Sequence, residues 1–152
     1  MKQFKNKVVT QEYLFSILPN LRKDKKIVFT NGVFDVIHKG HVFYLHQARQ
    51  LGDLLILGLN TDASVKRIKG NDRPVNNESD RAFVLSAFYF IDYIVFLSED
   101  TPIDLIKAIQ PDVLVKGSDY TIENVVGHEF VKETVLIDFQ TGYSSTNIIN
   151  KM

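Results

Sequence analysis

The chain has no cysteine among its 152 residues. This absence excludes disulfide bonds, thiolate catalysis and cysteine-ligated metal sites, and it agrees with a cytoplasmic location. The chain also lacks an excess charge of either sign, because 18 basic residues balance 18 acidic ones. We therefore expect neither nucleic acid nor an acidic membrane surface as a partner, and any cations that bind phosphate must gather locally.

Long apolar runs are missing as well. The longest, LLILGL and YIVFL, are far shorter than the roughly 20 residues that a membrane-spanning helix needs. Polar Gln11 and Glu12 interrupt what would have to be the apolar core of a secretion signal. The chain also carries neither the GxxxxGK[ST] loop of P-loop enzymes nor the GxGxxG turn of dinucleotide oxidoreductases. We therefore expect no membrane partner and neither of these two nucleotide-binding classes.

Strand and helix patterns alternate along the chain. Strand-like runs fall at residues 27–29, 53–59, 93–97, 113–115 and 135–137, and helical patterns lie between them. This alternation predicts an α/β fold with a doubly wound parallel five-stranded sheet in a single domain, residues 1–152. Residues 1–24 are predicted as an N-terminal helical extension, with an amphipathic accessory helix capped by Thr10 and ending near Leu21.

The stretch 27–45, IVFTNGVFDVIHKGHVFYL, carries the strongest functional signal. A strand, a turn at Gly32 and a helix start form a geometry in which free N–H groups and the helix dipole attract phosphate. His38 and His41 are three residues apart, so on one helical turn we expect their rings about 5–6 Å apart on one face. That spacing suits two imidazoles that grip one polyphosphate, and Gly40 between them leaves room for the anion.

Basic residues after the second strand are further candidates. Lys69, beside Gly70, is predicted to lie in a flexible loop from which it reaches a phosphate as a mobile charge. The neighbouring cations Lys66 and Arg67 fit a solvated helix face better.

Two arginines beyond that loop could bind substrate. Arg73 follows in the same basic, glycine-containing stretch. Arg81 lies in a predicted helix and could instead pair with Glu78, three residues before it. The spacing leaves both interpretations of Arg81 open.

Two later loops hold groups that suit a nucleotide. The loop after the fourth strand offers a backbone glycine, a carboxylate and an aromatic ring in Lys116-Gly117-Ser118-Asp119-Tyr120, although alone it would pass as an ordinary turn. The last helix begins near Ser144-Ser145-Thr146, just after Tyr143, and its three hydroxyl groups can cap the helix or donate to an anion. A second anion-binding helix start in the same sheet favours donation to an anion.

These segments together resemble the cytidylyltransferase-like nucleotidylyltransferase superfamily over residues 25–150. The resemblance rests on NGVFDVIHKGHVFYLHQARQLGD, GLNTDASVKRIKG, RPVN followed by DR, EDTP, and PDVLVKGSDYT. Within that superfamily the chain is similar to the sugar-phosphate adenylyltransferases that make ADP-heptose from heptose 1-phosphate for lipopolysaccharide-type glycans. The resemblance implies a Rossmann-like nucleotidylyltransferase fold.

The resemblance also implies roles for the candidate residues. His38 and His41 would contact the triphosphate, and Lys69 would assist them as a catalytic cation. We expect further nucleotide contacts from Asn31, Gly32, Val33, Phe34, Gly40, Lys116, Gly117, Asp119, Tyr120, Tyr143, Ser144, Ser145 and Thr146. The sugar phosphate is expected to meet Asp35, Arg73 and Arg81. Related enzymes often have threonine where Val33 stands, so at that position only the backbone N–H can donate.

The implied reaction is attack of the sugar-phosphate oxygen on the α-phosphorus of ATP, with release of pyrophosphate. Mg²⁺ would arrive with ATP, since no carboxylate cluster marks a protein metal site. In the fused form of the heptose enzyme a sugar kinase precedes this domain, so here we expect a separate kinase as a pathway partner. A homodimer is a further expectation.

Other functions fit parts of the sequence. A cytidylyltransferase acting on a small alcohol phosphate, such as glycerol 3-phosphate, would share the same motifs, and so would a non-catalytic nucleotide sensor. His128 and Glu129 begin the HExxH pattern of zinc hydrolases, but Lys132 occupies the place of the second histidine. An aminoacyl-tRNA synthetase also carries an HxGH motif, but the chain is short for that role and has no net positive charge.

Overall fold

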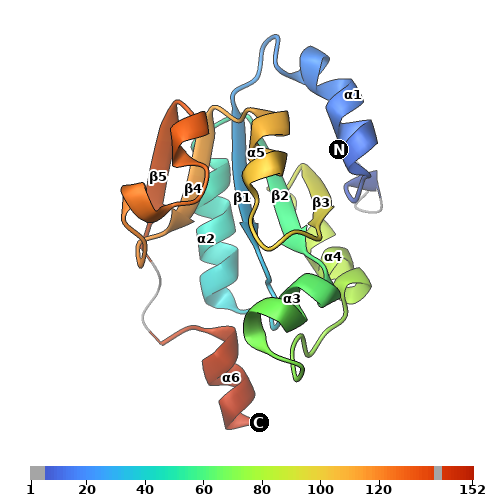
Figure 1. The fold of residues 1–152 in the computed structure, drawn as a ribbon, viewed down its shortest axis with the longest axis vertical. Helices are drawn as coiled ribbons and strands as arrows, with labels where there is room; N and C mark the ends of the chain where they lie inside the picture. The colour runs from blue at the N-terminus through green and yellow to red at the C-terminus, as the bar shows by residue number, and fades with distance from the viewer. Residues whose placement is uncertain (1–5, 139–141) are drawn as a thin grey trace.

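The computed structural model describes residues 6–138 and 142–152, which form one parallel sheet covered by helices on both faces (Figure 1). The five strands stand in the order β3-β2-β1-β4-β5, and all neighbouring strands are parallel. Their bounds are Ile27–Gly32 (β1), Leu54–Asn60 (β2), Tyr93–Leu97 (β3), Val113–Gly117 (β4) and Glu133–Ile137 (β5). The predicted doubly wound α/β fold is confirmed.

Six α-helices and two short 3-10 helices lie before, between and after the strands within the described residues. The α-helices are Gln11–Leu21 (α1), Lys39–Arg49 (α2), Asp62–Lys69 (α3), Glu78–Ser86 (α4), Ile103–Ile109 (α5) and Ser145–Lys151 (α6), and the 3-10 helices are Ile122–Asn124 (η2) and His128–Phe130 (η3). No helix in this part of the chain is both long and apolar enough to cross a bilayer.

The continuous apolar runs of the inner strands explain the two layers of helices. Successive residues of a strand face opposite sides of the sheet, so a strand that is apolar throughout needs a cover on each side. In β1, Val28 packs with α2 and α4, whereas its neighbours Ile27 and Phe29 pack with α1 and α5. All three strand residues are fully buried.

Helix α1 is a larger part of the fold than an accessory helix would be. It begins at the predicted cap, where the Thr10 hydroxyl accepts from the Tyr13 N–H, and it buries Leu14 and Leu18 in the core shared with α5. Just beyond it, the Arg22 guanidinium donates to the carbonyl groups of the last turn of α5. The N-terminal segment therefore completes one of the two helical layers.

Sequence pattern alone does not fix the ends of α4 and α5. Helix α4 stops at Ser86 although apolar residues continue beyond it, because Phe90 and Ile91 belong to a buried connection that leads into β3. Pro102 is the N-cap of α5 and not its first helical residue. Apolar spacing alone cannot separate a last helical turn from a buried connection.

The strand order reverses at β1. The chain runs outward from β1 to β2 and β3, and then crosses back to place β4 on the other side of β1. In doubly wound sheets the loops that leave such neighbouring strands separate at their carboxyl ends and open a crevice. The loops after β1, β4 and β5 meet there.

Candidate active site

A cavity of about 750 Å³ opens at this switch point. Every residue predicted to bind nucleotide or to act in catalysis lines it, together with Asp35 and Arg73, and only Arg81 among the predicted site residues does not. The sequence interpretation missed three of the lining residues, Tyr44, Gly142 and Asn147. The topology thus gathers segments more than 100 residues apart in the chain, such as His38 and Ser145, around one space.

The two histidines of the HxGH motif are stacked. Their ring centroids are 3.8 Å apart with an interplanar angle of 24°, closer than the helical spacing predicts. The approach is close because His38 is the N-cap of α2: its Nδ1 accepts from the Gly40 N–H at 3.1 Å, while His41 lies in the first turn. A side chain at position 40 would meet both the His38 ring and Tyr143 at about 3.0 Å. Gly40 therefore keeps this contact free of a side chain.

The geometry assigns a tautomer to neutral His38. Because Nδ1 accepts a hydrogen bond, the proton of the neutral ring sits on Nε2. That Nε2 atom and Nδ1 of His41 are both buried and have no hydrogen-bond partner among the described residues. The pair therefore offers polar ring atoms to a ligand in the cavity.

Both imidazoles are held in the neutral form. Burial lowers the pKa of His41 to about 4, and the nearby His38 and Lys69 add to this effect. Burial also lowers the pKa of His38. Loss of hydration on burial is therefore the main reason that both rings are neutral.

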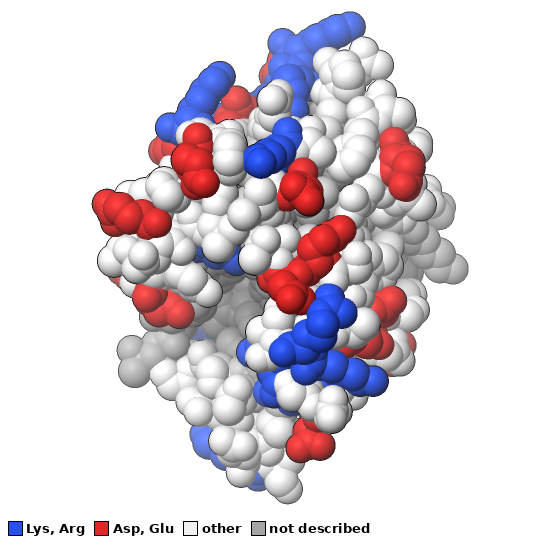
Figure 2. All heavy atoms as spheres, viewed as in Figure 1, with Lys and Arg blue, Asp and Glu red and all other residues white. Residues whose placement is uncertain are grey.

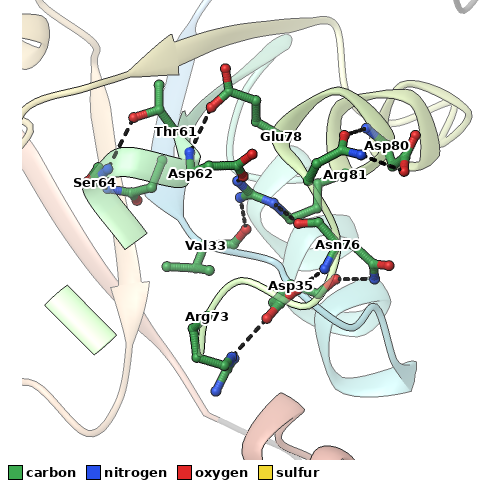
Figure 3. Close-up of polar contacts among 12 residues, drawn as sticks. Val33, Asp35, Thr61, Asp62, Ser64, Arg73, Asn76, Glu78, Asp80 and Arg81 are labelled. Carbon is green, nitrogen blue, oxygen red and sulfur yellow. Dashed lines mark hydrogen bonds and ion pairs between the residues drawn. The ribbon is translucent and has the colours of Figure 1, made fainter. Parts of the chain in front are cut away.

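Asp35 lies under the loop that follows α3 (Figure 3). Its carboxylate accepts from Arg73 Nε at 2.8 Å and from the N–H groups of Val75 and Asn76. Burial alone would raise the pKa of Asp35, but the Asn76 and Val75 N–H groups and the Arg73 guanidinium together lower it. Protein donors already occupy its oxygens, so the structure gives no support to the predicted contact of Asp35 with a sugar phosphate.

Arg73 is the group that Asp35 holds in place. Its Nε is committed to Asp35, whereas its Nη2 is buried and has no partner in the described part of the chain. A planar guanidinium fixed by one edge presents its other edge to an anion in a defined direction. Arg73 is therefore suited to bind a phosphate group in the cavity.

Lys69 also lines the cavity, but it is the last residue of α3 and not part of a loop. The turn away from the helix comes at Gly70, which has a φ of 102°. Burial and the positive charge of Arg73 lower the pKa of Lys69, and Asp35 opposes them.

Arg67 lies on the outside of α3 and pairs with Asp100 at 2.8 Å. Figure 2 shows basic side chains gathered over this helix.

Arg81 does not contact the cavity, so its predicted role in binding the sugar phosphate is wrong. Its side chain is fully buried, and its nitrogens donate to the carbonyl of Val33, the carbonyl of Asn76 and the carboxylate of Asp62 (Figure 3). The alternative pairing with Glu78 is also not formed: the Glu78 carboxylate accepts from the Asp62 N–H at 2.6 Å. Arg81 therefore bonds only to protein groups behind the site.

The floor of the cavity joins β1 to β4. The hydroxyl groups of Thr30 and Tyr44 are 2.8 Å apart, where one donates to the other, and the Val115 carbonyl lies 2.9 and 3.1 Å from them and accepts from the hydroxyl whose proton remains. Lys116 Nζ donates to the Asn31 carbonyl at 3.2 Å, and burial lowers the pKa of Lys116 to about 8 against the opposing effect of Asp119. Tyr44 could have been found from sequence, since it lies three residues after His41 on the same helix.

The start of α6 closes one side of the cavity. Ser144 caps this helix, and Ser145 Oγ donates to the Val36 carbonyl at 2.9 Å. The Tyr143 ring stacks on His38 with centroids 6.2 Å apart. The beginning of the predicted loop, residues 139–141, lies outside the described residues.

The chain is similar to known proteins in sequence and in structure. The sequence model described as Cytidylyltransferase-like matches residues 29–151. The proteins named "Bifunctional protein HldE" from Campylobacter jejuni subsp. doylei and Campylobacter concisus are 53% and 56% identical to the chain, each over 98% of it. The HldE protein of Helicobacter hepaticus is 54% identical over 97% of the chain. The chain spans only about a third of the length of these relatives, at 32%, 31% and 30%.

Solved structures give the same fold. The lipopolysaccharide core biosynthesis protein from Thermoplasma volcanium has a TM-score of 0.64 and 25% identity, covering 79% of this chain and 99% of its own. The pantoate-beta-alanine ligase from Francisella tularensis has a TM-score of 0.65 at 15% identity, over 95% and 78% of the two chains, which supports the fold alone. With a family match that begins in β1 and extends into α6, the chain belongs to the cytidylyltransferase-like nucleotidylyltransferases.

Proposed function

We propose that this chain transfers AMP from ATP to a sugar 1-phosphate. The proposed acceptor is heptose 1-phosphate, and the products are ADP-heptose and pyrophosphate. The observation that carries the proposal is a set of four buried polar side-chain atoms without a partner in the described chain, all on residues that line the cavity: Asn31 Oδ1, His38 Nε2, His41 Nδ1 and Arg73 Nη2. Buried polar atoms in native proteins are nearly always paired. Such a set therefore suits a polar ligand that brings the missing partners.

The charges favour an anion as that ligand. Lys69 and Arg73 lie on one side of the cavity, and the two histidines stand at the start of α2, where the helix dipole is positive. A triphosphate carries several negative charges and accepts hydrogen bonds at every oxygen. ATP bound there would place its phosphates between the histidines and the two cations.

The reaction needs no strong base, because the attacking oxygen of the sugar phosphate is already an anion. This oxygen forms a bond to the α-phosphorus, and the bond from the α-phosphorus to the oxygen bridging toward the β-phosphorus breaks. The electron pair leaves with pyrophosphate. The work of the protein is to align the two phosphates and to stabilise the charge that grows on the phosphoryl oxygens. The histidines, Lys69 and Arg73 supply donors for that purpose.

Mg²⁺ is proposed to enter with ATP. No group of three or more acidic or histidine side chains among the described residues could hold a metal ion. Mg²⁺ retains waters and binds phosphate oxygens readily, so it needs no protein cage. When bound, it would neutralise part of the triphosphate charge.

Heptose 1-phosphate as acceptor is supported by the similarity to the HldE proteins. The similar structure from Thermoplasma volcanium is named a lipopolysaccharide core biosynthesis protein, and that name fits a sugar nucleotide product. In this proposal a sugar kinase supplies the sugar phosphate. The reaction takes place in the cytoplasm, where ATP is available.

An assay of pyrophosphate release tests the proposal. ATP with heptose 1-phosphate should release pyrophosphate, whereas either compound alone should not. CTP and glycerol 3-phosphate, each tested in all pairings, would identify a cytidylyltransferase instead. A chain that binds ATP but releases no pyrophosphate with any acceptor would be a nucleotide sensor, and the proposal would be wrong.

A further inference from the structure

We propose that Arg81 is a positioning residue: it turns the Phe34 N–H toward the cavity and fixes the segments that carry Arg73 and Lys69. The inference rests on the proposed adenylyl transfer, because it assigns Arg81 to the alignment of the phosphate-binding groups. Arg81 would then act on the reaction without touching the substrate.

Three segments meet on this one guanidinium (Figure 3). Nη1 donates at 2.6 Å to the carbonyl of Val33, in the turn after β1. Nε donates at 3.0 Å to the carbonyl of Asn76, in the loop after Arg73. Nη2 donates at 2.8 Å to Asp62, the first residue of the helix that ends at Lys69.

A contribution to stability alone does not explain why a charged arginine is buried at position 81. The Arg81 side chain is 0% exposed and is among the largest fully buried side chains of the protein. Removing a charge from water costs several kcal/mol, and apolar replacements of buried ion pairs are often as stable or more stable. What an apolar side chain cannot do is hold three acceptors at fixed directions with one planar group.

The bond to Val33 has a direct effect on the cavity. A trans peptide is planar, so its C=O and N–H groups point in opposite directions. Because the Val33 carbonyl points to Arg81, the N–H of the same peptide, which belongs to Phe34, points away from Arg81. Val33 and Phe34 line the cavity, and no acceptor for the Phe34 N–H lies among the described residues. This N–H is therefore free to donate to a phosphate oxygen.

Phe34 needs such an anchor. Its φ is 48°, in the left-handed region that bulky side chains rarely adopt. That conformation is strained and persists only where the surroundings impose it. The Phe34 ring lies over Gly32, where an added Cβ would be only 2.7 Å away, and its edge meets His41 at a centroid distance of 5.1 Å. The Arg81 bond fixes the backbone on the other side of this ring.

The other two hydrogen bonds of Arg81 fix the segments that carry Arg73 and Lys69. The Asn76 N–H and the Arg73 side chain both donate to Asp35, so the bond from Arg81 to the Asn76 carbonyl braces the loop that presents Arg73. The bond to Asp62 braces the start of α3. Loss of Arg81 should therefore loosen several phosphate contacts together.

The test compares Arg81→Lys with Arg67→Lys. Lysine keeps the charge at position 81 but cannot reach three acceptors in one plane. Arg67 lies on the outer side of α3 and pairs with Asp100, so its replacement controls for a lost arginine near the same helix.

Turnover is expressed per folded molecule, at a temperature where both variants are fully folded by circular dichroism. We expect Arg81→Lys to lower kcat about 10²-fold, the usual effect of displacing reacting groups by about 1 Å. Arg67→Lys should stay within about twofold.

A double-mutant cycle with Lys69→Ala adds a measurement that a purely structural role would not change. If Arg81 positions Lys69, the loss from Lys69→Ala should be smaller in the Arg81→Lys background than in the parent. A kcat per folded molecule within about threefold of the parent for Arg81→Lys would overturn the proposal.

An amide NMR titration with inorganic pyrophosphate tests the inference without catalysis and without any variant. In the parent protein the Phe34 amide proton should shift downfield together with the histidine ring signals. If the histidine signals respond and the Phe34 amide does not, the proposal for Arg81 is wrong. A parent that responds in this way but releases no pyrophosphate from ATP would contradict the proposed function and leave the positioning role supported.

Discussion

Binding of ATP should draw a proton from solution onto the stacked histidines. In the free protein the pKa of His41 is about 4 and that of His38 is also lowered, so both rings are neutral at pH 7. A bound triphosphate favours the charged form. The complex therefore holds more protons than the free protein, and the affinity for ATP must fall as the pH rises through the histidine pKa of the complex.

The geometry sets the size of this effect. Raising the pKa of His41 from about 4 to 7 requires about 4 kcal/mol. One phosphate charge about 4 Å away supplies about 4 kcal/mol at an effective dielectric constant of about 20. A second proton on the neighbouring ring, 3.8 Å away, would meet a repulsion of similar size. A pKa of about 7 in the complex corresponds to an uptake of about half a proton at pH 7 from one phosphate charge. The further charges of the triphosphate raise this uptake toward one proton for the pair, and a second proton binds only at lower pH.

Calorimetry in two buffers of different ionisation enthalpy measures this uptake directly. His46 lies on the same helix but packs against Phe90 at a centroid distance of 5.4 Å, so His46→Gln is a matched control and should retain the full uptake. His41→Asn should reduce it. No uptake at pH 7, in a protein whose His38 and His41 variants both lose ATP affinity, would refute the reasoning and make the rings neutral donors throughout.

Three further predictions concern single side chains. Replacing His38 or His41 by alanine should lower kcat by about 10²–10³; the thermal midpoint should change little for His41→Ala, whose buried Nδ1 has no partner in the described fold, and fall modestly for His38→Ala, which also loses the N-cap bond to Gly40, and a folded variant with turnover within about threefold would contradict this. Lys69→Ala should impair turnover while Lys66→Ala does not, with melting temperatures close to the parent in both, and equal losses would show that the wrong lysine was chosen. Leu14→Ala should cost about 2–5 kcal/mol of unfolding free energy in urea titrations, since Leu14 is 0% exposed, and a loss below about 1 kcal/mol would mean that α1 is dispensable.

The sequence was most informative where function and local pattern coincide. A strand, a glycine turn and two histidines in one short stretch are enough to predict the helix start and its place in a parallel sheet. The alternation of strands and helices then predicts which loops meet, which is why Lys116 and Ser144 could be assigned to the same site as His38. Each of these inferences needs only spacing along the chain and the rule that parallel strands end together.

Contacts that depend on packing could not be predicted from the sequence. The bond from Arg81 to Val33 joins residues 48 positions apart, and nothing in the local spacing separates it from a pair with Glu78. The partners of Asp35 could not be predicted for the same reason, because its hydrogen-bond donors come from a loop 40 residues away. In both cases a charged residue near a site supports the site from behind, and only burial and partners distinguish that role from contact with substrate.

The packing of the N-terminal segment also constrains the order in which the protein can fold. Val8 forms a bridge with Ile94 at the edge of β3, and Arg22 bonds to the carbonyl of Gln110, 88 positions later. On the ribosome, α1 is made long before either partner exists. Its apolar face, which includes Leu14, stays exposed to solvent or bound to a chaperone until α5 has been synthesised. Helix α1 therefore precedes α5 in synthesis but can take its final place only after α5 has been made.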